Sequence, residues 1–235
     1  MDCQVEHKKN IQRISQVVLP LLKWYEKHAR VLPWRENAEP YRVWVSEIML
    51  QQTRVEAAKP YFDRFIARLP DLKSLAEVSE EVLLKLWEGL GYYNRARNLQ
   101  KTAQIIMNEY HGEFPGEFDA LFALPGIGEY TAGAICSIAF GLPTPAVDGN
   151  VVRVFSRVME DRGMDKKEIG EILKSVYPMD RTSDFTQSLM ELGATVCIPS
   201  DTPKCEICPI AFLCKAFQNN TQADFPPKIK PKARR

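Results

Sequence analysis

The stretch Leu124-Pro125-Gly126-Ile127-Gly128 decides how this chain is expected to fold, because it lies between two segments with helical spacing of apolar residues. Glycine permits positive φ angles, and such a turn leaves backbone N–H groups unobstructed where the next helix begins. The turn can therefore join two helices as a hairpin, with Gly126 and Gly128 binding a DNA phosphate. On its own, however, a Gly-x-Gly turn is more often an ordinary helix connection.

Apolar residues recur at helical spacing on both sides of this turn, and no segment shows sustained alternation of apolar and polar residues. The pattern predicts an all-α fold. In the first segment, from Ile11 to Tyr25, Pro20 is expected to kink or interrupt the helix. The other expected helices cover residues 41–52, 55–69, 80–88, 96–110, 131–140, 151–159 and 186–196.

Length, composition and charge restrict the class of protein. The chain has 235 residues, of which 45% are hydrophobic, enough to bury a core in one domain or in two closely packed lobes. The formal net charge is +1, so any DNA-binding surface must be local. Since no apolar run resembles a signal peptide or a membrane span, we expect a cytoplasmic or nucleoid-associated monomer with no membrane partner.

Four of the 6 cysteines crowd one short segment with the spacing C-x7-C-x2-C-x5-C, and they are Cys197, Cys205, Cys208 and Cys214. The segment is rich in proline and too polar to hold itself together by a core. In a chain without an export signal, such crowding favours metal over disulfides. Spacing alone leaves zinc and a four-iron cluster open as the metal group.

Two carboxylates have surroundings that suit acid–base chemistry. Glu47 lies among apolar neighbours in the expected helix 41–52, where burial would raise its pKa and let it donate a proton at neutral pH. Asp148 directly precedes the expected helix 151–159. Taken singly, Glu47 fits a surface glutamate and Asp148 fits an N-cap at least as well. Together, the two carboxylates favour catalysis.

Several motifs, taken together, resemble the MutY family of adenine DNA glycosylases, and the resemblance runs from about Trp24 to Cys214. Besides the hairpin turn and the cysteine segment, they are Leu32-Pro33-Trp34-Arg35, Ser46-Glu47-Ile48-Met49-Leu50-Gln51-Gln52-Thr53, Gly89-Leu90-Gly91-Tyr92-Tyr93 and Val147-Asp148-Gly149-Asn150. The implied fold is an all-α helix-hairpin-helix glycosylase with the active-site cleft between two lobes. We expect a six-helix barrel lobe at 36–142, an iron-sulfur cluster lobe at 1–35 and 143–218, and a basic, linker-like tail at 219–235.

The resemblance also implies catalytic roles. Glu47 would protonate adenine, and Asp148 would stabilise the oxocarbenium-like sugar or trap it covalently, as paired carboxylates do in glycoside hydrolysis. Tyr130 would line the pocket beside Asp148, and Asn150 would position the water or the acidic group. Bifunctional relatives such as endonuclease III carry a nucleophilic lysine at the position of Tyr130. A tyrosine there implies a monofunctional glycosylase.

The residues implied to bind the substrate are Trp34, Arg35, Leu50, Gln51, Gln52, Tyr92 and Glu191. Of these, Gln52 and Tyr92 would contact the purine opposite the flipped adenine, and Glu191 would hydrogen-bond the adenine itself. The implied substrate is double-stranded DNA with an A:8-oxoguanine or A:G mispair, and the implied cofactor is one [4Fe-4S] cluster on the four cysteines. Gly126, Gly128 and lysines such as Lys204 and Lys215 would contact phosphates.

Two other functions stay open. Thymine glycosylases acting on G:T mismatches resemble this chain in having a tyrosine at the position of Tyr130. A glycosylase for oxidised pyrimidines is a second enzymatic alternative. Gln51, Gln52 and Tyr92 favour adenine over both. A DNA-binding module without catalysis is the other alternative, against which Glu47 and Asp148 speak.

Two features depart from the family pattern. The first gap in the cysteine segment holds seven residues where six are usual. The sequence also stops where full-length members continue into a domain that recognises 8-oxoguanine, so we expect weaker discrimination of the lesion.

Overall fold

The computed structural model describes residues 3–199 and 202–227, and of residues 3–6 only the backbone. All regular structure in these residues is helical, which confirms the all-α prediction. Within them, none of the helices combines the length and the apolar character that crossing a membrane requires. The chain divides into a continuous unit, Val31–Ala146, and a discontinuous unit, Met1–Arg30 with Val147–Arg235. The cleft expected between two lobes stays a prediction.

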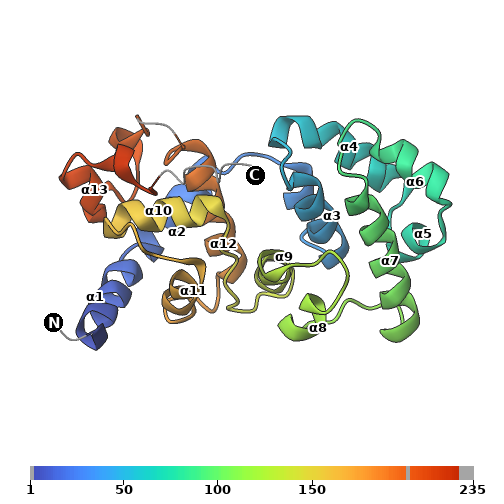
Figure 1. Ribbon diagram of the computed structural model, residues 1–235, viewed down its shortest axis with the longest axis horizontal. Coiled ribbons are helices and arrows are strands. Elements are labelled where there is room, and N and C mark those ends of the chain that lie inside the picture. The colour runs from blue at the N-terminus through green and yellow to red at the C-terminus, as the bar shows by residue number, and fades with distance from the viewer. Residues whose placement is uncertain (1–2, 200–201, 228–235) are drawn as a thin grey trace, which may run out of the picture. The chain divides into compact units, whose positions relative to one another are not determined.

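The continuous unit, which runs in Figure 1 from the blue of α3 through cyan and green to the yellow-green of α9, consists of helices around a large apolar core. Its elements are the 3-10 helix Pro33–Arg35, α3 (Pro40–Leu50), α4 (Val55–Arg68), α5 (Leu72–Glu77), α6 (Glu80–Trp87), α7 (Asn94–Glu109), α8 (Phe118–Phe122), α9 (Glu129–Ala134) and the π-helix Ile135–Ala139. Helix α3 packs against α4, α7 and α9, and α5 packs against α7. The bulkiest core side chains, Trp44, Phe62, Phe65 and Trp87, are almost completely buried.

The expected hairpin is the connection between α8 and α9, which pack against each other. Gly126 has a φ of 76°, and a Cβ there would lie 2.8 Å from the Cβ of Asn98 on α7, so both backbone and space require glycine. Gly128 has an ordinary φ of −88° and is the N-cap of α9. Thr102 on α7 holds the turn by donating its hydroxyl to the Pro125 carbonyl at 2.8 Å.

The discontinuous unit brings the blue N-terminal helices of Figure 1 together with the yellow to red ones. Its helices are α1 (Cys3–Ser15), α2 (Val18–His28), α10 (Gly149–Met159), α11 (Lys166–Lys174), α12 (Thr182–Thr195) and α13 (Lys215–Gln218), with 3-10 turns at Cys205–Ile207, Ala211–Leu213 and Gln222–Asp224. Helix α12 packs against both α2 and α10, while α1 packs against α11. Side chains from both ends of the sequence form one buried core.

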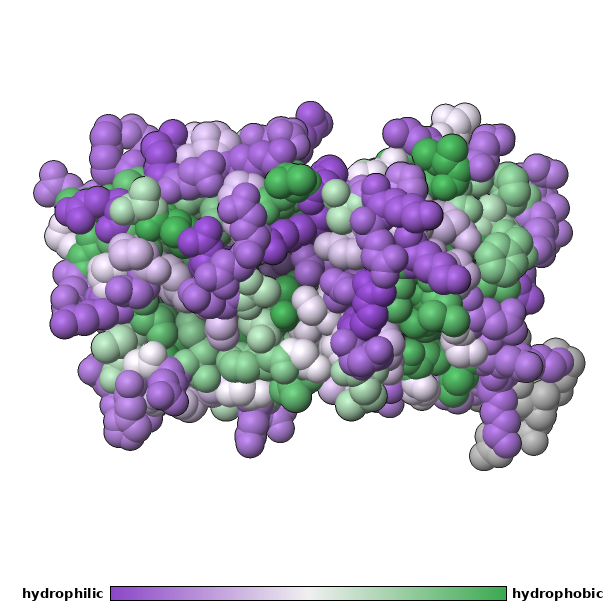
Figure 2. Space-filling view, turned by 180° about the vertical axis from the view of Figure 1, so that it is seen from behind, coloured by the Kyte–Doolittle hydropathy of each residue, from purple (hydrophilic) through white to green (hydrophobic). Residues whose placement is uncertain are grey.

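Hydrophilic side chains cover most of the face shown in Figure 2, and hydrophobic residues are visible between them in small groups. The large apolar side chains lie mainly inside the two cores.

Two expectations about the ends of the chain need adjusting. The helix expected from Ile11 to Tyr25 is interrupted, but before Pro20: α1 ends at Ser15 and α2 begins at Val18. Pro20 lies in the first turn of α2, where a missing N–H costs no helical hydrogen bond. The linker does not begin at residue 219, because Phe225 is buried and Arg157 donates from Nε to the carbonyls of Gln222 and Phe225, both at 3.0 Å. Residues 228–235 lie outside the described residues.

Candidate functional site

Glu47 lies near the C-terminal end of α3 in the continuous unit. The helix begins with Pro40, a residue suited to the first helical position. Because α3 packs on three other helices, Val43 to Met49 are all buried, and Glu47 is only 7% exposed. The alternative of a surface glutamate is therefore wrong. Its role as proton donor stays a prediction.

Asp148 is the N-cap of α10 in the discontinuous unit. Its Oδ1 accepts a hydrogen bond from the backbone N–H of Val151 at 2.8 Å, and its Oδ2 accepts one from Asn150 Nδ2 at 2.6 Å. The cap expected of an aspartate at this position is present, and it also fixes the orientation of the carboxylate. Asn150 thus lies beside Asp148, as the resemblance implies.

Arg153 extends this chain of contacts toward the cysteine segment. Its Nη2 donates to Asn150 Oδ1 and to the Gly193 carbonyl, both at 2.7 Å, and its Nε donates to the Cys197 carbonyl at 2.8 Å. Burial lowers the pKa of Arg153, although a guanidinium stays charged in proteins. The motifs gave no indication of this residue; the available signal was that Arg153 is a basic residue among the valines of α10 and is buried with them.

Replacing Gly193 with alanine is expected to reduce the free energy of unfolding by about 1–3 kcal/mol, the usual cost of overpacking. A Cβ at Gly193 would lie 2.5 Å from the Cβ of Asn150 and 3.2 Å from its Cα, so α10 and α12 would have to separate. Chemical denaturation measures the change. Gly170→Ala on α11 is the control, because no atom lies within 4 Å of its added Cβ. Equal stability of the two variants would contradict this close packing.

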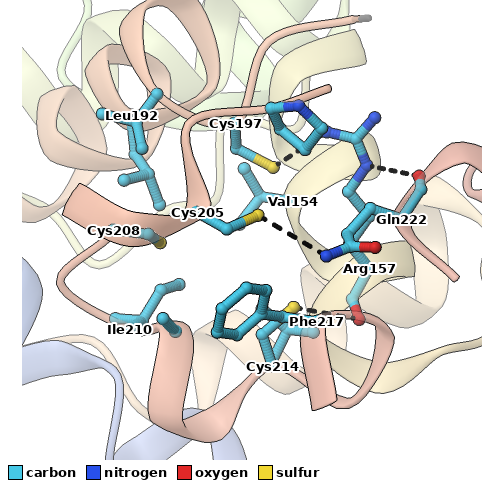
Figure 3. Close-up of a pocket in the computed structure, with 14 residues that line it drawn as sticks. Val154, Arg157, Leu192, Cys197, Cys205, Cys208, Ile210, Cys214, Phe217 and Gln222 are labelled. Carbon is cyan, nitrogen blue, oxygen red and sulfur yellow. Dashed lines mark hydrogen bonds between the residues drawn. The ribbon is translucent and has the colours of Figure 1, made fainter. Parts of the chain in front are cut away.

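The four predicted ligands Cys197, Cys205, Cys208 and Cys214 line one pocket of the discontinuous unit (Figure 3). All four are free cysteines. Arg157 donates from Nη1 to the sulfur of Cys197 at 3.4 Å. Burial raises the pKa of the Cys208 thiol to about 12 and that of Cys214 to about 11.

This donor set fits a group larger than a single ion. Among the described residues, no three His, Cys, Asp or Glu side chains are close enough to hold one metal ion. A zinc site needs its ligands at about 2.0–2.3 Å from a common centre. Instead, the four cysteines are spread around one small pocket of about 20 Å³, and they come from different parts of the segment (Figure 3). A polynuclear cluster on four thiolates matches this arrangement better than zinc does.

Gln52 and Tyr92, the two residues expected to contact the opposite purine, share an unusual backbone conformation. Both are left-handed, with φ of 58° and 47°, which is uncommon outside glycine and is concentrated at functional sites. Both side chains are exposed, Tyr92 by 66%. Their positions suit residues that reach outward to a ligand.

The other expected site residues of the continuous unit lie at its surface or just below it. Trp34 is buried with its ring edge-on to Phe62, 5.4 Å between centroids. Four further side chains expected at the site are half-buried: Arg35, Leu50, Gln51 and Tyr130. Gly126 and Gly128 are exposed, so their backbone is accessible to a phosphate.

Glu191 on α12 forms an ion pair inside the discontinuous unit. Its side chain has no exposed surface, and its carboxylate accepts hydrogen bonds from Arg30, from Nε at 2.6 Å and from Nη2 at 3.1 Å. Its expected contact with a flipped adenine stays a prediction.

Comparison with known proteins identifies relatives. Residues 45–179 match the family described as HhH-GPD superfamily base excision DNA repair protein. The adenine DNA glycosylase of Buchnera aphidicola (subsp. Acyrthosiphon pisum) is 46% identical, and the matched region covers 86% of this chain and 58% of the Buchnera protein. The adenine DNA glycosylase of Homo sapiens is 43% identical, and the matched region covers 86% of this chain and 39% of the human protein. The chain thus spans about half the length of these curated relatives, and the resemblance predicted from the motifs is confirmed.

Solved structures share the fold. A thermostable thymine-DNA glycosylase is 28% identical, with a TM-score of 0.81 over 90% of this chain and 98% of its own. Endonuclease III in a non-covalent complex with DNA is 26% identical, with a TM-score of 0.76 over 90% of this chain and 98% of the endonuclease chain. These likenesses confirm a helix-hairpin-helix glycosylase fold.

Proposed function

Because this chain belongs to the HhH-GPD superfamily of base excision DNA repair proteins, we propose that it is a monofunctional DNA glycosylase acting on adenine mispaired with 8-oxoguanine or guanine. The observation that carries the proposal is Glu47, a buried carboxylate on α3 within the motif Ser46–Thr53. The relatives named adenine DNA glycosylases support adenine as the base.

The reaction hydrolyses the bond between adenine and C1′ of the sugar. Glu47 donates a proton to the base, which then leaves as neutral adenine. Asp148, oriented by Val151 and Asn150, stabilises the positive charge that develops on the sugar. Water adds its hydroxyl to C1′, and its proton restores the acid.

Tyr130 determines what happens to the DNA strand. It lies at the second position of α9, directly after the hairpin turn. A phenol cannot form the Schiff base by which a lysine leads to strand cleavage. The abasic product therefore stays intact until alkali breaks it.

The partner is double-stranded DNA, from which the adenine must be flipped out. Exposed Gln52 and Tyr92 contact the opposite purine and fill the gap, while the backbone at Gly126 and Gly128 binds a phosphate. Lys204 and Lys215 add salt-dependent phosphate contacts. The protein acts as a monomer in the cytoplasm, on DNA of the nucleoid.

The four cysteines of the pocket would hold one [4Fe-4S] cluster. Such a cluster would cross-link the cysteine segment within the discontinuous unit and would take no part in hydrolysis. Arg157 contributes by donating to the sulfur of Cys197 and to the Ile198 carbonyl, at 3.4 and 2.9 Å.

Single-turnover release of adenine from A:8-oxoguanine and A:G duplexes tests the function, with a T:G duplex for comparison and with and without alkali. We expect adenine release and strand breakage only after alkali. Release of thymine would instead support a thymine glycosylase, to which the likeness to a thymine-DNA glycosylase structure already points. Folded, iron-containing protein that releases no base would support a DNA-binding module.

A further inference from the structure

One side chain of the continuous unit connects the two segments that carry Gln52 and Tyr92. From the first turn of α7, Arg95 donates from Nη1 to the carbonyls of Ile48, Met49 and Gln51 at 2.9, 3.1 and 2.7 Å. From Nη2 it donates to the carbonyls of Leu90 and Gly91 at 2.9 and 3.2 Å. A single guanidinium thus binds the C-terminal end of α3 and the turn that leads into α7.

The carbonyls of Ile48 and Met49 lack helical partners, because the last carbonyls of a helix have no N–H ahead of them. The Gly91 carbonyl also accepts a hydrogen bond from Trp87 Nε1 at 3.1 Å. A cation at a helix C-terminus is also favoured by the helix dipole. The guanidinium lies over the rings of Trp87 and Tyr92, at 5.3 and 5.6 Å from their centroids. Arg95 therefore also contacts the exposed aromatic ring expected to reach the DNA.

The two left-handed residues each follow a carbonyl that Arg95 binds: Gln52 follows Gln51, and Tyr92 follows Gly91. A carbonyl and the next N–H belong to one rigid peptide plane. Fixing that carbonyl therefore restricts the φ of the residue that follows. The same guanidinium thus supports both strained conformations.

A small cavity adjoins this arrangement. It measures about 80 Å³ and is lined by Trp44, Ile48, Gln51, Arg95, Asn98, Leu99, Pro125 and Gly126. Within the described residues, two buried nitrogens of this lining, Trp44 Nε1 and Arg95 Nε, have no hydrogen-bond partner. A cavity of this size has room for ordered water, which satisfies such donors. Its lining reaches the hairpin turn at Gly126.

We propose that Arg95 is a positioning residue for mispair recognition: it holds Gln52 and Tyr92 in their left-handed conformations, and water in the adjoining cavity links it to the hairpin turn. The proposal rests on the proposed function, because it assumes that Gln52 and Tyr92 contact mispaired DNA. It assigns Arg95 no contact with the DNA itself.

Arg95→Met and Arg95→Lys test the proposal, with Arg97→Met as the matched control. Arg97 lies on the same helix but is exposed and pairs with Glu80 at 2.7 Å. Affinity for an A:8-oxoguanine duplex and for a fully paired duplex is measured on each folded protein. We expect Arg95→Met to weaken the affinity for the mispair about tenfold, with little change for paired DNA. Lysine should restore part of the preference, and Arg97→Met should keep all of it.

Combining Arg95→Met with Gln52→Ala and Tyr92→Ala separates positioning from general destabilisation. If Arg95 acts through these residues, its effect on the preference for the mispair disappears once they are alanine. Full additivity, or an equal loss of affinity for both duplexes, would overturn the proposal while leaving the proposed function intact. Wild-type protein that shows no preference for mispaired adenine would overturn both.

Discussion

Replacing Glu47 with glutamine is expected to slow adenine release by roughly a thousandfold, within the range that a general acid contributes. Glutamine has nearly the same shape, so it can occupy the buried position on α3, but it has no acidic proton to donate to the base. The measurement is the single-turnover rate on an A:8-oxoguanine duplex. Affinity for the same duplex should stay close to that of the wild type, because the change removes a proton rather than a contact surface.

Glu88→Gln is the matched control for this change. Glu88 is exposed and pairs with Lys85 at the end of α6, and exposed ion pairs of this kind contribute little. Its rate should therefore equal that of the wild type. A Glu47→Gln protein that unfolds like the wild type yet loses less than about tenfold in rate would refute the assignment of Glu47 as the acid.

Replacing Cys208 with alanine is expected to remove the bound iron and to lower the unfolding temperature by about 10 °C or more, which corresponds to about 3 kcal/mol for a chain of this size. The loss should be large because the regular structure of the cysteine segment is limited to short 3-10 turns, so that cluster ligation supplies much of its folding energy. Iron and sulfide analysis, the visible absorption spectrum and circular dichroism follow the change.

Cys136→Ala is the control that separates cluster binding from the loss of a buried thiol. Cys136 is completely buried but belongs to the continuous unit. This variant should keep its iron and lose only the stability that a small cavity costs. Retention of iron in Cys208→Ala would contradict the four-cysteine cluster, and zinc in the purified wild type would support the zinc alternative.

Most helices could be predicted from the apolar pattern of the sequence, including the short α6 at Glu80–Trp87, but α11 could not. The expected helix 55–69 corresponds to α4, Val55–Arg68, and the expected helix 151–159 to α10, Gly149–Met159. Helix α11 was missed because only Ile169, Ile172 and Leu173 are buried in its nine residues, too few for a clear period. Its N-cap Asp165 was the signal that could have located it.

Among site residues, those within motifs could be predicted and those that act through backbone carbonyls could not. Glu47 and Asp148 follow from their motifs, and their environments agree with a buried carboxylate and a capping one. Arg95 binds carbonyls up to 47 positions away, and any residue type supplies a carbonyl, so the sequence carries no signature of such a contact. Glu191 shows the converse, because its motif gave no sign that Arg30 would pair with it.

The discontinuous unit has a consequence for the order of events during protein synthesis. The core face of α2, with Leu21 and Trp24, packs against α12, which the ribosome makes only after the whole of Val31–Ala146. At typical elongation rates this interval is on the order of ten seconds. The continuous unit can fold during this interval, while the apolar face of α2 stays exposed because α12 has not yet been synthesised. A chaperone acting on the nascent chain would therefore find its binding segment at α1 and α2.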